Sequence, residues 1–257
     1  RNKLTLRLAS RLHDVSLPDL LEVAGLEGAH VRLRLNGDVR VEGPLWPLAL
    51  EADLDLEASG FEVLDDSYHA PEAWTAFGFL TARLAGRARV GAHQTQIAGI
   101  TITRGTSEAV VSGTLAYDVG RGLDLRASAT RLDLTDLGAI AGLPLAGVGP
   151  IGASIEGPYE KLVISGTAEL ADFGLFGYRM GDATASVLFQ DMVLHIDHLI
   201  LHRGRGTATG SVALDFNNRQ PSRIQGDFTL RELALADALD TINAPAALIE
   251  RLEADLS

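Results

Sequence analysis

The residues best suited to bind a metal ion lie in one short run, His195-Ile196-Asp197-His198, followed by His202. Imidazole and carboxylate groups are common metal ligands. Side chains alternate between the two faces of a β-strand, so the first histidine and the aspartate share one face, and the other two histidines share the opposite one. The four side chains converge only if a bulge interrupts the strand. The pattern therefore favours histidines on a polar strand face, and no metal site is expected.

Acidic residues in the segment 65–75 are the nearest approach to a catalytic pair. Asp65-Asp66 and Glu72 have the residue types of a glycoside hydrolase, which works with two carboxylates. The only aromatic side chains beside them are Tyr68 and Trp74, too few for a sugar platform. Solvated loop acids are the favoured interpretation, and the segment is expected to be a loop that packs Trp74 on a sheet edge or forms a flap.

A glycine-rich run, Ala146-Gly147-Val148-Gly149-Pro150, lacks the lysine and the strand-to-helix context of a phosphate-binding loop, and it predicts a turn. The sequence thus contains no recognisable catalytic site or cofactor site. We expect a protein that is not an enzyme and has no cofactor.

Composition narrows the classes of partner. The net charge of −12 disfavours nucleic acid and anionic lipid headgroups. Hydrophobic residues make up 46% but aromatic residues only 5%, so the apolar surface is aliphatic and suits acyl chains. The absence of cysteine excludes disulfides and thiolate zinc sites. No apolar run is long enough to span a membrane, so membrane contact is expected only through segments outside this chain.

Alternating apolar and polar residues predict β-strands along most of the chain. Residues 29–42 have an arginine-rich polar face, residues 48–58 an acidic one and residues 80–90 again a basic one, with a Gly43-Pro44 turn between the first two. This order predicts antiparallel neighbours whose charges pair across strands. The alternation at Leu4–Leu8 indicates a strand from a preceding unit. Further strands are expected at 96–103, 109–117, 123–130, 162–170, 183–189, 193–202, 207–216 and 224–230.

Short helices and strand glycines complete the expected architecture. Helices are predicted over 16–25, 135–142 and 236–253, the last interrupted at Pro245. Glycines at 113, 166, 210 and 226 fall inside predicted strands, where glycine usually marks a bend, and they predict a strongly curled sheet.

Internal similarity has a period near 115 residues. Glu42-Gly43-Pro44 recurs as Glu156-Gly157-Pro158, and Asp19-Leu20 recurs as Asp136-Leu137. The unit is a short helix followed by amphipathic strands, and stacked units make elongated proteins. The expected divisions are the end of a preceding repeat at 1–15, repeat units at 16–131 and 132–232, and the start of a third, helical at first, at 233–257.

The motifs of this unit resemble those of the TamB and AsmA-like proteins. The resemblance extends over nearly the whole chain and rests on Leu132-Asp133-Leu134-Thr135-Asp136-Leu137, Ala141-Gly142-Leu143, Ile155-Glu156-Gly157-Pro158, Ile164-Ser165-Gly166, Leu199-Ile200-Leu201-His202-Arg203-Gly204 and Thr209-Gly210-Ser211-Val212. It implies an all-β, mostly antiparallel β-taco: an elongated, curled groove of repeated amphipathic strands with short helices at the repeat junctions. It also implies a periplasmic location in a diderm bacterium, an inner-membrane anchor outside this chain, and outer-membrane assembly factors as further partners.

We therefore expect a non-enzymatic hydrophobic conduit that carries phospholipid or other acyl-chain lipid between the inner and outer membranes, as a fragment of a longer bridge protein. The alternatives are a structural or adhesive β-repeat, or an outer-membrane assembly factor, with a closed dry core. An outer-membrane barrel is disfavoured because aromatic girdles are missing. The residues expected to line the lipid groove are Val31, Leu33, Leu35, Leu48, Leu50, Leu54, Leu56, Leu80, Leu84, Val90, Leu123, Leu125, Leu162, Ile164, Leu170, Phe228 and Leu230.

Overall fold

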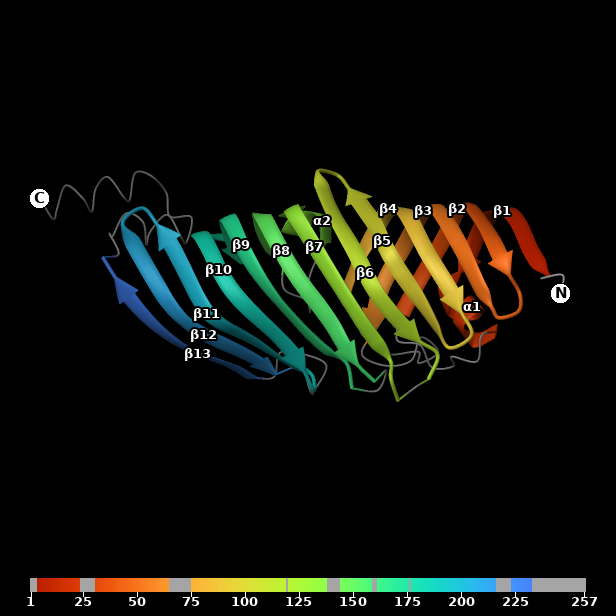
Figure 1. The fold of residues 1–257 in the computed structure, drawn as a ribbon. Coiled ribbons are helices and arrows are strands. Elements are labelled where there is room, and N and C mark those ends of the chain that lie inside the picture. The colour runs from red at the N-terminus through yellow and green to blue at the C-terminus, as the bar shows by residue number, and fades with distance from the viewer. Residues whose placement is uncertain are drawn as a thin grey trace, which may run out of the picture.

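The fold is one antiparallel sheet of thirteen strands, seen in a computed structural model that describes residues 4–23, 31–64, 75–118, 120–137, 144–158, 161–175, 177–215 and 223–232. The strands lie side by side in sequence order from β1 to β13 (Figure 1). The predicted all-β class is confirmed. The strands are β1 (Thr5–Ser16), β2 (Val31–Pro44), β3 (Ala49–Leu64), β4 (Thr75–Gly91), β5 (Gln94–Arg104), β6 (Ser107–Ala116), β7 (Leu123–Asp133), β8 (Leu145–Gly157), β9 (Val163–Leu175), β10 (Tyr178–Gln190), β11 (Val193–Arg203), β12 (Gly206–Asp215) and β13 (Arg223–Arg231).

Two turn predictions are wrong. The run Ala146 to Pro150 lies inside β8, because its glycines fit a close approach of β9 rather than a turn. A Cβ atom at Gly149 would lie 1.9 Å from the carbonyl oxygen of Glu169. Gly43 and Pro44 likewise belong to β2, and the chain reverses just beyond them, where Leu45 and Leu48 form an isolated bridge.

Two short helices lie at the predicted junctions. Helix α1 (Leu17–Val23) starts where the Ser16 hydroxyl accepts a 3.4 Å hydrogen bond from the Asp19 amide, and α2 (Leu134–Leu137) follows β7 directly. Neither is long and apolar enough to cross a membrane. The predicted third helix, the later part of the second and most of the loop at 65–75 lie outside the described residues, and Thr75 begins β4.

The sheet is curled, as its strand glycines predicted. Leu145 of β8 and Leu175 of β9 pack against buried Leu214 of β12. Strands β8 and β12 lie four positions apart in the sheet, a spacing of about 19 Å if the sheet were flat. Side chains cannot bridge that distance, so the sheet must bend toward its apolar face. In Figure 1, strands β2 to β4 bend so that part of each lies behind the front of the sheet.

The internal similarity extends to the pairing of strands. In β1 and β2, Leu8 pairs with Val41 and a register shift follows Leu12. In β7 and β8, Leu125 pairs with Ile155 and the same shift follows Ala129. Within the described ranges, each helix is then followed by six strands. The two parts of the chain therefore share their bulge positions as well as their motifs.

Candidate functional site

One face of the sheet is crossed by a continuous row of apolar residues and glycines, here called the first ladder. Each member is paired with the next across neighbouring strands, so the row runs across the strands and along the sheet. From β2 to β13 it consists of Val39, Leu54, Gly86, Ile100, Val111, Ala127, Ala153, Gly166, Val187, Ile196, Val212 and Gly226.

A second ladder runs beside the first, two or three residues away along each strand. Its members are Val41, Ala52, Ala88, Ile97, Gly113, Leu125, Ile155, Ile164, Phe189, Leu194, Leu214 and Ile224. With neighbouring strands about 4.8 Å apart, each ladder extends for about 50 Å. No polar side chain interrupts either row, and the two rows define the apolar face.

Burial on this face is partial. Among the residues predicted to line the groove, Leu35, Leu56 and Leu170 are buried. Eleven others are half-buried, namely Val31, Leu33, Leu48, Leu50, Leu54, Leu84, Val90, Leu123, Leu125, Leu162 and Ile164. Most of these positions therefore keep some contact with solvent.

Three of the residues predicted to line the groove are exposed, and one of them, Leu80, does not lie with the other groove residues. It is 77% exposed, while its neighbour Phe79 packs against the cluster formed by Leu35, Leu56 and Ala58. Alternation from buried Ala82 would place Leu80 on the apolar face, but its exposure shows that the alternation changes between them, opposite Gly60, which has a φ of 60°. Phe228 and Leu230 pair with Gly210 and Ala208 on the apolar face, and they are 51% and 60% exposed on β13.

Sequence reasoning missed several ladder residues. Ile155 lies in β8, which was not predicted, and Ile97, Val111, Val187 and Ile196 lie in strands that were predicted but not assigned a face. Alternation within each strand was the available signal. The bulges next to Ile97 and Ile196 interrupt that alternation, so the face of a residue follows from the sequence only on one side of each bulge.

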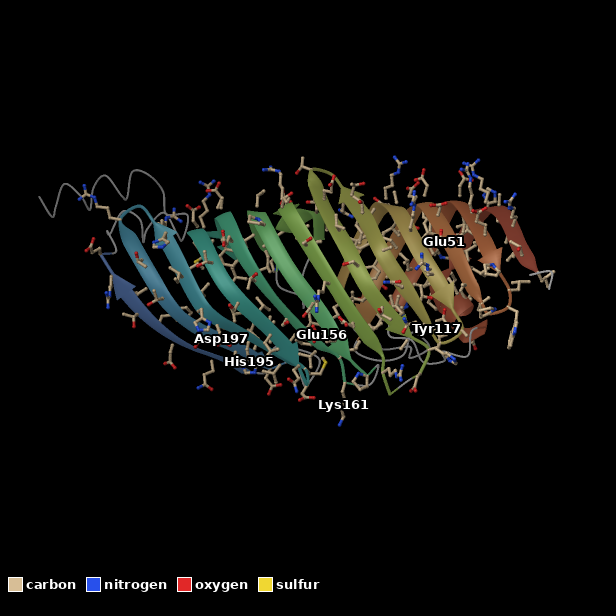
Figure 2. The ribbon with its side chains drawn as sticks, in the orientation of Figure 1. Glu51, Tyr117, Glu156, Lys161, His195 and Asp197 are labelled. Atoms are coloured by element: carbon tan, nitrogen blue, oxygen red, sulfur yellow. The ribbon has the colours of Figure 1, made fainter. Side chains whose placement is uncertain are left out.

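The opposite face of β3 and β4 is charged, and its predicted cross-strand pairing is confirmed. Arg83 donates two hydrogen bonds of 3.0 Å to Asp55. Arg87 lies 3.1 Å from Asp53, and Arg89 lies 2.7 Å from Glu51, which Figure 2 labels. The hydrogen bond from Arg83 lowers the pKa of Asp55 below its ordinary value of 3.8. These exposed pairs keep the face solvated and contribute little stability each.

The histidine run lies on a bulge. His198 has a φ of 52°, and the pairing with β12 shifts between Ile196 and Leu199. His195 pairs with Ala213 and His202 with Thr207, both on the polar face. The expectation that His202 lies on the face opposite to His195 and Asp197 is therefore wrong, because the bulge reverses the alternation. Even so, no group of three such residues in the described part of the chain could hold a metal ion.

A hollow of about 770 Å³ lies over the polar side of β1 to β5. Its walls include Arg11, Asp38, Asp55, Arg83 and Arg104. Asp38 and Asp55 are paired with Arg11 and Arg83, so the charges largely neutralise one another. The hollow offers little to an acyl chain or to a strongly charged ligand.

Comparison with known proteins adds no relative: no family model, no curated protein and no solved structure matches the chain. The site must therefore be interpreted from its own geometry.

Proposed function

We propose that the chain is a non-enzymatic hydrophobic conduit, in which acyl chains of phospholipid lie along the two ladders while headgroups stay in water. The observation behind the proposal is the pair of unbroken apolar rows, about 50 Å long, that remain half-buried along most of their length. A curled sheet would give such rows the form of a groove. Apolar surface of this extent in a folded protein is usually covered by a partner.

The energetics of such a groove favour movement along it. Each buried CH₂ group contributes about 0.8 kcal/mol to binding. The ladder positions are aliphatic or glycine except for Phe189, so the contacts change little from one strand to the next. A lipid is then held without a deep minimum that would trap it.

The setting of the conduit rests on the resemblance to TamB and AsmA-like proteins. On that basis we place the chain in the periplasm of a diderm bacterium, between the inner and outer membranes, with its anchor in a segment outside this chain. Outer-membrane assembly factors are the expected protein partners.

A closed structural repeat is the second candidate, favoured by one specific contact. Leu145 and Leu175 reach Leu214 across the curl, so the C-terminal part of the apolar face covers itself at that point. If the same happened along the whole sheet, the apolar face would be a dry core, and the chain would serve as a spacer or an adhesive.

Photo-crosslinking separates the two candidates. A benzophenone amino acid at Val111 is expected to capture phospholipid in cells, whereas the same group at the adjacent, exposed Ser112 is expected to capture none. Native mass spectrometry of the purified chain should also find bound phospholipid. Equal labelling at the two positions, or a chain free of lipid by both measurements, would exclude the conduit.

A further inference from the structure

The junction helix α2 is attached to an earlier hairpin by a specific polar cluster. The hydroxyl of Ser107, 6% exposed in the turn between β5 and β6, donates a 2.6 Å hydrogen bond to the Asp136 carboxylate and accepts one of 2.9 Å from the Asp133 amide. Arg104 lies 3.8 Å from the same carboxylate, with both side chains mostly buried. Helix α2, which follows β7, is thus held by the turn Arg104-Gly105-Thr106-Ser107. This turn begins at the end of β5, two strands away from β7 in the sheet.

The same type of turn occurs once more in the described residues. Arg203-Gly204-Arg205-Gly206 joins β11 and β12, and Gly204 has a φ of 57° where Gly105 has 53°. Arg104 donates a hydrogen bond to the carbonyl of Thr81, and Arg203 donates one to the carbonyl of Arg179, in each case on the strand before its hairpin. The arginine-glycine turn is therefore a recurrent part of the unit.

Helix α1 carries a carboxylate, Asp19, at the position that binds such a turn in α2. Asp19 corresponds to Asp136 in the repeat, and β1 corresponds to β7 with matching register. Yet Asp19 is exposed, and no ion pair to its carboxylate is found in the described part of the chain. Leu20 is 46% exposed, whereas Leu137 in the equivalent position of α2 is half-buried.

We propose that α1 and the outer edge of β1 form a docking surface for a β-hairpin whose turn has the sequence Arg-Gly-X-Ser. The hairpin would add to the sheet beside β1, as β6 lies beside β7, and its arginine and serine would bind the Asp19 carboxylate. The partner is another unit of the same kind, and this inference holds whether the apolar face binds lipid or forms a core.

The internal junction can be reproduced to test this. Residues 94–121, which contain the β5–β6 hairpin, are joined directly before Thr5, so that the added hairpin precedes β1 as the original precedes β7. Hydrogen exchange of the α1 amides is then measured. We expect exchange to slow by at least about tenfold relative to the unextended chain, the factor typical of a charge-assisted hydrogen bond in a partly buried setting.

Two matched variants identify the contact. Replacing the added copy of Arg104 by alanine, or making Asp19→Asn, should each remove most of the protection, while Asp197→Asn on the distant β11 should leave it intact. Unchanged exchange in the extended chain would overturn the proposal. Protection that survives both variants would also overturn it, since the hairpin would then act without the polar cluster.

Discussion

Strands β2 to β4 and strands β8 to β12 share an apolar face but differ on the other face. In β3 and β4 the polar positions are filled by paired charges, such as Asp53 with Arg87. In the later strands, hydroxyl and imidazole groups share these positions with carboxylates such as Glu169: Ser154 and Ser165 lie 2.8 Å apart, and Thr207 lies 3.2 Å from His202. The two ladders nevertheless cross both regions without a polar residue.

This difference indicates what each face requires. A solvated face tolerates any polar side chain, because water satisfies it. The apolar face is restricted to aliphatic residues and glycine in every strand from β4 to β9, as Gly86, Ile100, Val111 and Gly166 show. The apolar face is therefore the feature that unites the sheet, and the regions differ chiefly in how far it closes on itself.

The largest expected effect concerns that closure. Leu214→Ala removes a buried side chain that joins β12 to β8 and β9, and it should lower the free energy of unfolding by about 2–5 kcal/mol in urea denaturation. Leu54→Ala, at a half-buried position of the N-terminal region, should cost about 1–2 kcal/mol because less apolar surface is lost. Equal costs would show that the two regions are closed to the same degree.

Substitution of Gly113, which lies in β6 between the two regions, should lower stability nearly as much. Gly113 has a φ of 138°, and a Cβ atom there would lie 2.0 Å from the Asp124 carbonyl oxygen. Gly113→Ala is expected to destabilise the chain by about 1–3 kcal/mol, measured by thermal unfolding. The control is Gly152→Ala in β8, whose nearest new contact would be 3.6 Å away and which should cost less than about 1 kcal/mol.

The two helix junctions should respond unequally to the same substitution. Asp136→Asn weakens the contacts to buried Ser107 and to Arg104, so it should lower stability by about 1–3 kcal/mol. Asp19→Asn changes an exposed carboxylate and should stay within about 0.5 kcal/mol. Urea denaturation of both variants provides the comparison, and similar losses would mean that Asp19 already has a structural role in this chain.

The smallest effect is expected from the charged face. The pKa of Asp55 is lowered in the folded state, so its contribution is present above its ordinary pKa of 3.8 and is lost as the pH falls through the lower, folded value. Asp55→Asn should therefore flatten the loss of stability on acidification below about pH 4 and change little at neutral pH. A variant with the acid sensitivity of the original chain would show that the pair contributes nothing.

Alternation predicted most of the fold because it reports burial directly. Residues 48–58 and 80–90 needed only their own pattern to be placed in β3 and β4. The errors arise where a distant backbone decides the outcome. Gly149 lies in a strand because Glu169 approaches it, and Leu80 is exposed because the alternation of β4 changes opposite Gly60, whose φ is 60°. Local sequence contains neither fact.

The candidate site was predictable in kind but incomplete in membership. Leu54 and Leu125 were assigned to the apolar face and lie in the ladders, whereas Ile155 and Ile196 were missed. Pairing across strands, not spacing within a strand, determines which residues form a ladder. A bulge such as that at His198 changes the face of every residue beyond it.

The strict order of the strands has a consequence for assembly. Every strand from β2 to β12 pairs with the strand before it and the strand after it, and many of these neighbours, such as β4 and β5, are joined by short connections. Contacts between near neighbours in sequence favour rapid folding, which is unusual for an all-β protein. The sheet can therefore lengthen one hairpin at a time as the chain becomes available, each new strand templated by the previous one.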